Sequence, residues 1–514
     1  MSGYQHYVEN PYVLNFIALW SMTFSLTGLL CRVFSIDTYL GLRVIHLVYV
    51  VLMQTAVYLY LRRYIKTRYI IAGLVLATLA HFGSYTEMNY NDYSAGLFML
   101  SVMSFHHGIT VDKRRYVLIA GALAGAAFFF RVVNVTLIVL PLLSCIVSCR
   151  WQSAMGRGAR VAWFAVGYVA GAALMVGAMA VDGTLGAFAQ TVGDLFSISS
   201  ERRSPHGFIT VIMSVLMLYK GEVAGFSVVL VVALLMFCAF LKLKGIVRFA
   251  MLAVLSVSVV ACIYFGESPA NITVGLCLLA LALVCVGNRH RADFASLYVL
   301  SMIVPMVMPI GSNAGPDFYG KDVCFLSLPM AVAVVAEWPM SSSYTQSCRR
   351  AMLLAFTSIC VAMLYTNVKR PQMEEGNRLQ CLYRVNSPLT GPILTTKENA
   401  DMHNNLISEL QPIVPRGSYM ICTFSQTAVS LLGCKMWAII HTEFSSDRMN
   451  ARYIAVAYRH SGELPYLLLR KSTITDHERY VLQCLESIRP YGKVWESGDF
   501  VLLKDVSGDR LQKG

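Results

Sequence analysis

The chain has 514 residues, of which 56% are hydrophobic and 14% are charged, and its mean hydropathy is +0.57. This composition is typical of polytopic membrane proteins. The formal net charge is +13, but most of the excess basic charge lies in short gaps between apolar segments, and no basic stripe with interleaved aromatic residues occurs. The sequence therefore excludes a nucleic-acid partner.

Twelve apolar segments occur from residue 39 onward, and most are long enough for a helix to cross a hydrocarbon core of about 30 Å. They cover residues 39–61, 68–85, 91–108, 115–131, 132–149, 160–181, 223–243, 246–265, 270–287, 294–311, 322–338 and 350–366. The sequence therefore predicts an all-α polytopic membrane domain over residues 39–366. With a possible extra span before it, the domain would have about 12–13 transmembrane helices.

Lysine and arginine residues fall in every second gap between these segments. Six alternate gaps hold 17 of them, whereas the intervening gaps hold five. The six basic gaps are 62–68, 113–115, 150–160, 242–248, 289–291 and 349–350. Short cytoplasmic loops retain positive charge and translocated loops do not. The alternation therefore predicts that residues 367–514 lie on the extracytoplasmic side.

The first 38 residues admit two interpretations. Residues 12–30 are apolar enough to span a membrane, yet they include five Asn, Ser and Thr residues. The segment can equally be a helix that lies in the outer membrane interface. A spanning segment places Met1 inside and an interfacial one places it outside, while the orientation of everything after Tyr39 is the same. Residues 1–38 are thus an outer interfacial segment or a first span.

The composition of residues 367–514 is that of a soluble domain. Strands are predicted at 391–396, 419–424, 464–470 and 493–504, and helices at 397–414 and 477–488. Strands that alternate with helices favour a small α/β domain with a partly parallel sheet. No glycine-rich phosphate loop occurs in it. Recognition or support is therefore favoured over nucleotide chemistry.

The cysteine pattern bears on disulfides and on metal binding. Four of the 14 cysteines lie in the soluble tail, namely Cys381, Cys422, Cys434 and Cys484. In an oxidising compartment they can form up to two disulfides, with three possible connectivities. No CxxC pair or Cys/His cluster has zinc spacing. The sequence therefore predicts no particular set of metal ligands.

Polar residues of the membrane part gather at the predicted outer ends of the segments. Polar groups near a bilayer are costly, which makes them the first functional candidates. A carboxylate there suits a general base that acts on an acceptor hydroxyl, and guanidinium groups suit a lipid-linked phosphate. The candidate catalytic residues are Glu87 and Asp92, and the candidate substrate-binding residues are Arg131, Asn134, Arg202, Arg203, His206 and Asn313.

Each candidate also has a simpler interpretation. Arg131 at a span end can be an anchor that extends to the interface, and Arg202 and Arg203 can be ordinary surface charges. Glu87 and Asp92 can simply mark an external loop. Their location together on one predicted membrane face favours a functional site.

Four stretches resemble the GT-C class of polytopic glycosyltransferases, in particular bacterial members related to the dolichyl-phosphate-mannose and aminoarabinose transferases. Residues 4–11 followed by 40–43 are similar to the run after that family's catalytic loop. Residues 90–94 resemble its "YN-x-x-S" opening of the fourth span, and residues 120–134 its "aGxlxGxxxxxRxxN" hairpin. Gly311, Ser312 and Asn313 resemble a late outer loop. The likeness covers roughly residues 4–340, and the tail resembles the family's periplasmic domain in pattern only.

The resemblance implies a polyprenyl-phosphate sugar donor, an inverting transfer to a lipid or glycan acceptor, and a place in the bacterial inner membrane with the tail in the periplasm. It also implies a catalytic Asp or Glu in the first external loop. Here the sequence departs from the family, because that loop and the span before it would precede Met1. Either the chain starts late, or a carboxylate other than the nearby Glu9 substitutes. Some relatives use a divalent metal and others do not, and no ligand set in the sequence decides between them.

Two other functions remain open at this point. A lipid or polysaccharide transporter or flippase would need polar residues through the depth of the bilayer. A catalytically inactive, truncated remnant would use the α/β tail to bind a partner. The leading hypothesis is a membrane glycosyltransferase that acts on the outer face.

Overall fold

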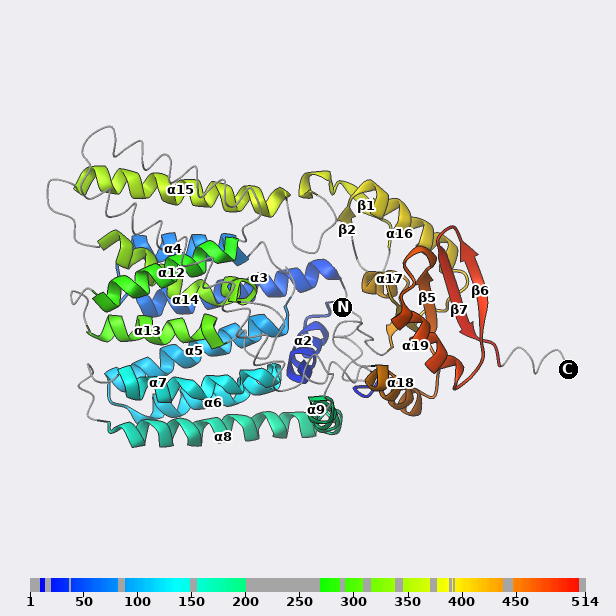
Figure 1. The fold of residues 1–514 in the computed structure, drawn as a ribbon, viewed down its shortest axis with the longest axis horizontal. Helices are drawn as coiled ribbons and strands as arrows, with labels where there is room; N and C mark the ends of the chain where they lie inside the picture. The colour runs from blue at the N-terminus through cyan, green and yellow to red at the C-terminus, as the bar shows by residue number, and fades with distance from the viewer. Residues whose placement is uncertain are drawn as a thin grey trace. The chain divides into compact units, whose positions relative to one another are not determined.

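The computed structural model describes residues 10–13, 20–36, 38–81, 88–147, 155–199, 269–286, 292–307, 316–337, 345–369, 377–387, 391, 393–437 and 447–507. These residues are mostly helical, with a small sheet region near the C-terminus (Figure 1). The helices are α2 (Ser21–Val33), α3 (Tyr39–Leu61), α4 (Thr67–His81), α5 (Tyr90–Thr110), α6 (Arg114–Phe130), the 3₁₀ helix η2 (Val132–Ile138), α7 (Val139–Val147), α8 (Arg157–Val181), α9 (Leu185–Ser199), α12 (Pro269–Val286), α13 (Ala292–Val307), α14 (Pro316–Glu337), α15 (Thr345–Lys369), η5 (Arg378–Gln380), α16 (Lys397–Leu410), α17 (Gln426–Leu431), α18 (Asp447–Ser461), η6 (Lys471–Thr473) and α19 (Asp476–Glu486). The strands are β1 (Tyr383–Val385), β2 (Ile393–Thr395), β3 (Tyr419–Cys422), β4 (Lys435–Met436), β5 (Tyr466–Arg470), β6 (Tyr491–Ser497) and β7 (Phe500–Asp505).

The chain divides into two compact units. The helical unit comprises His46–Leu174 and Val211–Leu379. The tail unit, which contains the sheets, comprises Met1–Ile45, Met175–Thr210 and Gln380–Gly514. The tail unit therefore draws on three separate parts of the sequence.

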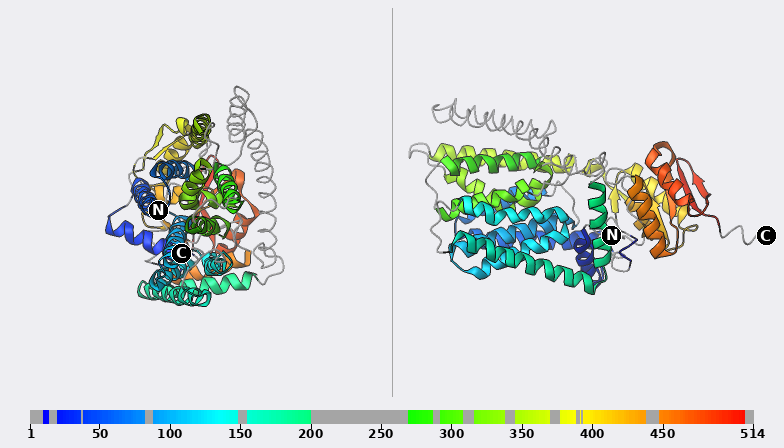
Figure 2. Two further views of the ribbon diagram at one scale, coloured as in Figure 1. Left: turned by 90° about the vertical axis from the view of Figure 1, so that its left-hand side faces the viewer. Right: turned by 60° about the horizontal axis from the view of Figure 1, so that its bottom comes forward.

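Helices α3 to α6 run alternately in opposite directions, and Figure 2 shows the described helices of this unit side by side. Gln54 of α3 donates to Thr78 of α4 at 2.6 Å, and Ser101 of α5 donates to the Ala120 carbonyl oxygen of α6 at 2.8 Å. The start of α3, the end of α4, the start of α5 and the end of α6 therefore lie at one end of the unit. We call this end the site end.

The opposite end carries the basic turns, and we call it the basic end. The α3–α4 and α5–α6 turns lie there and contain the first two basic gaps of the sequence. Lys66 pairs with Glu337 at the end of α14 at 3.0 Å. The Arg114 guanidinium lies 5.7 Å from the ring centroid of Trp163, near the start of α8. The α3–α4 turn thus lies beside the end of α14, and the α5–α6 turn lies beside the start of α8.

Helices α6 and α8 approach each other closely through glycines. A Cβ atom at Gly121 or Gly125 of α6 would collide with main-chain atoms of α8, and one at Gly167 or Gly171 of α8 would collide with main-chain atoms of α6. Each helix therefore presents a Gly-x-x-x-Gly pair to the other. Small residues at this spacing let helix backbones come together, as they commonly do in membrane helix pairs.

Two of the described helices are long and apolar enough to cross a membrane, judged by length and composition. They are α3 with 23 residues and α8 with 25 residues. Several shorter apolar helices accompany them, including α4. The segments predicted at 223–243 and 246–265 lie outside the described residues, as does the last part of the one predicted at 68–85.

The segment predicted as a continuous span at 132–149 is different in the structure. Residues Val132–Ile138 form a 3₁₀ helix, and the α-helix begins only at Val139. The Asn134 side chain donates to the Ala127 carbonyl oxygen at 2.8 Å, which ties the turn back to α6. Side chains that bond to nearby backbone carbonyls compete with regular helix formation. The sequence also predicts a tight turn at residues 131–134, and the structure extends that turn as a 3₁₀ helix to Ile138 before the α-helix of the predicted span begins.

The described part of residues 12–30 is helix α2, which has 13 residues. At about 1.5 Å per residue it is about 20 Å long, shorter than a hydrocarbon core of about 30 Å. Its serine and threonine side chains are buried, and Leu29 and Val33 are exposed. Helix α2 alone does not span, and residues 14–19 lie outside the described residues.

The tail unit contains a five-stranded sheet in the order β4-β3-β5-β7-β6, and a separate β1–β2 pair. Strands β4, β3 and β5 are parallel, whereas β5, β7 and β6 are antiparallel. This arrangement confirms the predicted α/β tail with a partly parallel sheet. Strand β7, which ends at Asp505, is the last strand among the described residues.

Side chains of the central strands alternate between two apolar clusters. Met420 and Leu468 pack in one cluster with residues of α16 and α17. Ile421 and Leu467 pack in the other, with residues of α18 and α19. Adjacent residues of a strand face opposite sides of a sheet. The sheet is therefore covered by helices on both faces (Figure 1).

Residues near the N-terminus also belong to the tail unit. The ring of Tyr12 stacks on that of His460, with ring centroids 4.1 Å apart. Asn10 donates through Nδ2 to the His460 carbonyl oxygen at 3.4 Å. Val13 is buried in the cluster that contains Trp437. The short described stretch before α2 therefore packs on the C-terminal part of the chain.

The closing strand predicted at 493–504 is a hairpin in the structure. Strands β6 and β7 are joined by a turn that contains Gly498, whose φ of +53° is accessible to glycine at little cost. Beside this turn, Lys471 and Lys493 both contact the Glu496 carboxylate and lower its pKa to about 2. The prediction of one long strand was wrong because the turn interrupts the pairing.

The four tail cysteines form no disulfide with one another in the structure. Cys422 and Cys434 lie in the core around β3 and β4, and burial raises the pKa of each thiol to about 12. Cys381 and Cys484 are partly exposed. Up to two disulfides are possible from the sequence, but the structure contains none among these four residues.

Candidate functional site

The start of α5 fixes the position of Asp92, one of the two predicted catalytic residues. Asn89 is the N-cap, and its side chain accepts hydrogen bonds from the N–H groups of Asn91 and Asp92. In return, Asp92 Oδ2 accepts from the Asn89 N–H at 2.9 Å. This reciprocal pair is a capping box, which satisfies N–H groups that a helix start otherwise leaves without partners. The capping box engages Oδ2 of Asp92.

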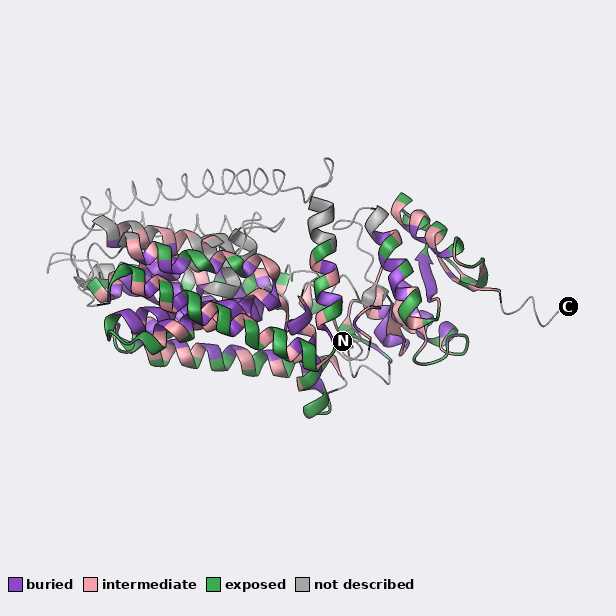
Figure 3. Cartoon of the chain, turned by 90° about the horizontal axis from the view of Figure 1, so that it is seen from below, coloured by how far each residue is buried: buried purple, intermediate pink, exposed green. Residues whose placement is uncertain are grey.

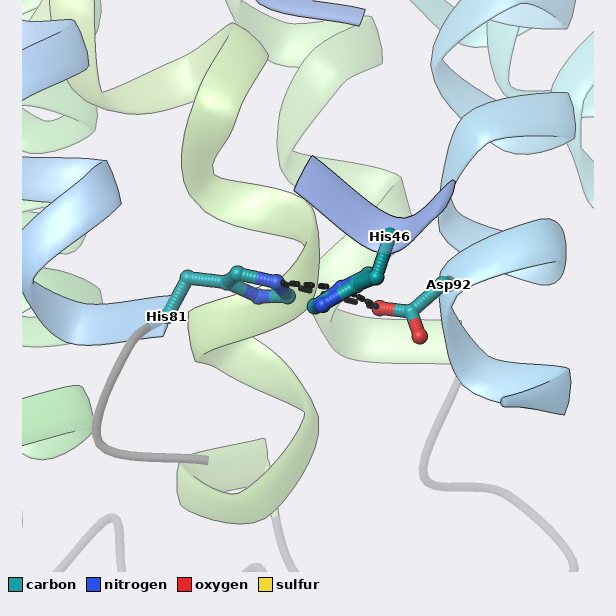
Figure 4. A group of neighbouring side chains, drawn as sticks. All are labelled: His46, His81 and Asp92. Atoms are coloured by element: carbon teal, nitrogen blue, oxygen red, sulfur yellow. Dashed lines mark hydrogen bonds and ion pairs between the residues drawn. The ribbon is translucent and has the colours of Figure 1, made fainter. Parts of the chain in front are cut away.

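The other oxygen of the carboxylate faces two histidines from the preceding helices (Figure 4). Asp92 Oδ1 lies 3.5 Å from Nε2 of His46 on α3 and 3.9 Å from Nε2 of His81 at the end of α4. The two Nε2 atoms are 3.0 Å apart. We call His46, His81 and Asp92 the His–His–Asp cluster. All three residues are buried, with exposures of 3%, 1% and 2%.

Antiparallel packing brings the cluster together at the site end. His46 lies two turns into α3, His81 is the last residue of α4, and Asp92 lies in the first turn of α5. Gly73 lets α4 approach α14 closely, because a Cβ there would lie 2.9 Å from the Cβ of Pro329. The three cluster residues thus belong to three successive helices, and the α4 helix that carries His81 is also packed against α14.

A second contact aligns α3 with α5 beside the cluster. Tyr49, one turn after His46, donates its hydroxyl to the Asp92 carbonyl oxygen. The hydroxyl lies against Gly96, where a Cβ atom would collide with it. The absence of a side chain at Gly96 thus makes room for the bond that fixes the Asp92 backbone.

The predicted Arg131 and Asn134 also lie at the site end. The Arg131 guanidinium is centred 5.7 Å from the ring centroid of Tyr90 in the first turn of α5, and the residue is only 5% exposed. Asn134 donates to Ser94 Oγ at 2.7 Å. The two motifs that contain Tyr90–Ser94 and Arg131–Asn134 therefore meet in space.

Two buried amide oxygens near these residues lack a hydrogen-bond donor. They are the Oδ1 atoms of Asn91 and Asn134, neither of which has a partner within the described part of the chain. Buried polar atoms are nearly always paired with protein or water. The site end therefore retains hydrogen-bonding capacity that the described residues do not use.

The other predicted site residues cannot be placed in the same way. Glu87, Arg202, Arg203, His206 and Asn313 lie outside the described residues. The structure thus brings together Asp92, Arg131 and Asn134 out of the set that the sequence predicts.

Sequence reasoning did not single out His46 and His81. Both occur in predicted spans, where an ionisable side chain is a functional candidate by default. Their separation of 35 residues, however, gives no ligand spacing that would mark them as a pair. A search for histidines within apolar segments would have found them.

The cluster has the composition of a metal site. Its three ligand atoms all lie within 4.8 Å of one another. Metal–nitrogen and metal–oxygen bonds of about 2.0–2.2 Å place neighbouring ligand atoms roughly 3.0–3.5 Å apart. Two of the three observed separations meet this range, and the third, at 3.9 Å, needs a small side-chain movement. The residues present therefore fit a metal ion.

Comparisons with known proteins do not identify the chain. No protein-family model matches it, and no curated protein sequence matches it either.

Proposed function

We propose that this chain is a multi-pass membrane glycosyltransferase of GT-C type. It moves a sugar from a polyprenyl-phosphate donor to a lipid or glycan acceptor on the outer face of a bacterial inner membrane. The observation that carries the proposal is the location of Asp92 and Arg131 at one end of the helical unit, opposite the basic end. A carboxylate and a guanidinium at the same membrane face are what a transfer from a lipid-linked phosphate requires.

The surface of the helical unit supports placement in a membrane. Figure 3 shows exposed residues along the outward faces of its helices. On α3, Val48 and Leu52 are 53% and 62% exposed, and on α8, Val169 and Leu174 are 66% and 68% exposed. Large exposed apolar surfaces are unusual in water-soluble monomers and mark contact with a membrane or a partner. Together with the glycine-mediated packing of α6 and α8, they favour lipid.

Charge then orients the unit within the bilayer. The basic end would face the cytoplasm, because positive loops remain on that side. The site end would face the opposite side, together with the tail that follows α15. This orientation places the reaction where a polyprenyl-phosphate sugar is presented on the outer leaflet.

In the proposed transfer, the acceptor hydroxyl oxygen forms a bond to the sugar's anomeric carbon. The bond from that carbon to the phosphate oxygen breaks, and the polyprenyl phosphate leaves with the electron pair. Asp92 Oδ1 accepts the hydroxyl proton as a general base. Arg131 supplies positive charge for the phosphate oxygens, which guanidinium groups bind well.

A transfer assay in proteoliposomes tests the proposal. The probes are polyprenyl phosphates that carry radiolabelled mannose or aminoarabinose, supplied with bacterial lipid as acceptor. Asp92→Asn should lower the transfer rate by about 10²–10⁴-fold, the usual contribution of a general base. The matched control is Glu337→Gln at the basic end, which should transfer at close to the wild-type rate.

A second pair of variants addresses phosphate binding. Arg131→Ala should reduce transfer strongly, whereas Arg63→Ala, an exposed arginine at the basic end, should have little effect. Equal losses from both arginines, or an Asp92→Asn variant with wild-type activity, would refute the assignment of the site.

Protease accessibility tests the orientation independently of catalysis. In intact cells whose outer membrane has been permeabilised, external protease should release residues 367–514. Protection of this domain would overturn the topology on which the proposal depends.

A further inference from the structure

The His–His–Asp cluster raises a question of charge that the proposed function does not answer. The Asp92 side chain is 1% exposed. Within the described part of the chain, its ion pairs are with His46 and His81 alone. A buried carboxylate needs a compensating positive charge, because its transfer out of water is costly.

The two imidazole rings lie close enough to share one hydrogen bond. A neutral histidine has one ring nitrogen that donates and one that accepts. With the two Nε2 atoms 3.0 Å apart, one must donate and the other must accept. Both Nε2 atoms also lie close to Asp92 Oδ1, at 3.5 Å for His46 and 3.9 Å for His81, so three potential ligand atoms lie together. One cation at the centre of the three atoms would satisfy all of them together.

We infer that His46, His81 and Asp92 together bind one divalent transition-metal ion. The ligand atoms are the two Nε2 atoms and Oδ1, all within 4.8 Å of one another. The inference rests on this geometry and holds whether or not the chain transfers a sugar.

Neighbouring groups fix the orientation of the Asp92 carboxylate and of the His81 ring. The Asn89 N–H occupies Oδ2 at 2.9 Å and leaves Oδ1 directed at the histidines. Tyr49 bonds the Asp92 carbonyl oxygen, which fixes the backbone. The His81 ring packs edge-on against Phe325, with centroids 5.6 Å apart. Oriented ligands of this kind lose little entropy when a metal binds.

The ligand types select the class of ion. Imidazole nitrogen suits zinc, iron, cobalt and nickel, whereas magnesium and calcium prefer oxygen ligands alone. Two imidazoles and one carboxylate therefore favour Zn²⁺ or a similar ion over Mg²⁺. Three protein ligands also leave a coordination position for a small molecule, as in catalytic rather than structural zinc sites.

The inference is compatible with the role proposed for Asp92. Each carboxylate oxygen has two lone-pair directions. Oδ1 can therefore ligate an ion through one and accept a hydrogen bond through the other. When bound, the ion would supply fixed positive charge at the site end.

Metal analysis of the full chain in detergent tests the inference. The protein is stripped with a chelator, incubated with Zn²⁺, Co²⁺ or Mg²⁺ separately, and freed of excess ion before elemental analysis. We expect about one Zn²⁺ or Co²⁺ per chain, and no retained Mg²⁺. Bound Co²⁺ should also give visible absorption bands that report nitrogen and oxygen ligands.

Variants establish which residues bind. His46→Gln, His81→Gln and Asp92→Asn should each weaken Zn²⁺ binding by at least tenfold, and the His46→Gln/His81→Gln pair should abolish it. The matched control is His107→Gln, a histidine of α5 near the basic end, which should bind like wild type. Thermal unfolding of the metal-free proteins shows whether each variant is folded.

Two results would overturn the inference. One is a wild-type protein that retains no Zn²⁺ or Co²⁺, or that retains Mg²⁺ equally well. The other is a folded His46→Gln/His81→Gln variant that still binds one Zn²⁺ per chain. Binding without any sugar transfer would refute only the proposed function, and transfer by a chain that binds no ion would refute only this inference.

Discussion

The close contact between α6 and α8 predicts that a single methyl group will separate the two helices. A Cβ atom at Gly121 would lie 2.9 Å from both the Phe164 carbonyl carbon and the Tyr168 nitrogen. Favourable contacts between such atoms occur at about 3.5–4.0 Å. The same Cβ would overlap the Phe164 carbonyl oxygen outright, so the Gly121→Ala substitution must move the backbones apart by roughly 1 Å or more.

The expected loss follows from that displacement. A gap of about 0.5–1 Å forfeits a quarter to a half of each dispersion contact along the interface. Overpacking of this kind usually lowers the free energy of unfolding by about 1–3 kcal/mol. Alanine is about 0.8–1 kcal/mol better than glycine in a helix interior, which offsets part of the loss. We expect a net destabilisation of about 0–2 kcal/mol for Gly121→Ala.

The matched control is Gly177→Ala, on the same α8 helix. A Cβ at Gly177 would meet nothing within 4 Å, so this variant should gain up to about 1 kcal/mol from helix propensity alone. Thermal unfolding of the purified chain in detergent, followed by circular dichroism, gives both values. Gly121→Ala should unfold at a clearly lower temperature than Gly177→Ala. Equal or reversed transition temperatures would show that the helices do not pack through these glycines.

Three further predictions concern the site and the tail. Gly96→Ala should displace the Tyr49 hydroxyl from α5 and weaken Zn²⁺ binding, whereas the Gly177→Ala control should bind Zn²⁺ like the wild type. Cys422 and Cys434 should resist alkylation at pH 8 until the tail unfolds, because burial raises the pKa of both thiols to about 12; rapid labelling of the native protein would contradict their burial. The lowered pKa of Glu496 means that its pairs with the two neighbouring lysines stabilise the tail above its ordinary pKa of 4.5 and are lost as the pH falls through about 2. The protection of the β6–β7 amides, measured relative to their intrinsic exchange rates at each pH, should therefore fall over that range in the wild type but not in Glu496→Gln.

Much of the helical architecture could be predicted from hydropathy and charge. The segment predicted at 39–61 coincides with α3, because a continuous apolar run there ends at a pair of arginines. The alternation of basic gaps placed the α3–α4 and α5–α6 turns at the same end. Long apolar runs and clustered charges are local features of the sequence, so helices can be predicted from them without knowing how the helices pack.

The predicted elements differ from the observed ones where a few side chains or a turn determine the backbone conformation. Asn134 bonds back to α6 and replaces the expected helix start with a 3₁₀ turn. Gly498 reverses the chain within a stretch of strand-forming residues. Hydropathy carries no information about either event, since both regions have the composition of the element that was predicted.

The candidate site was predicted only in part for a related reason. Asp92 was found because it follows an apolar segment at the predicted outer face. Its partners His46 and His81 were missed, because which faces of α3, α4 and α5 meet depends on helix rotation. The close approach at Gly96, which sets how α3 lies on α5, has no counterpart in a hydropathy pattern.

The origin of the His–His–Asp cluster in three successive helices has a consequence for biosynthesis. Sites built from distant parts of a sequence form late, because long loops must close before their contacts can stabilise anything. Here the most N-terminal and most C-terminal members are His46 and Asp92, which lie on α3 and α5 with α4 as the one helix between them. The cluster can therefore assemble as soon as α5 has left the ribosome, long before residues 367–514 are synthesised. An ion captured at that stage would hold the first three helices of the bundle in register while the rest of the chain is still being made.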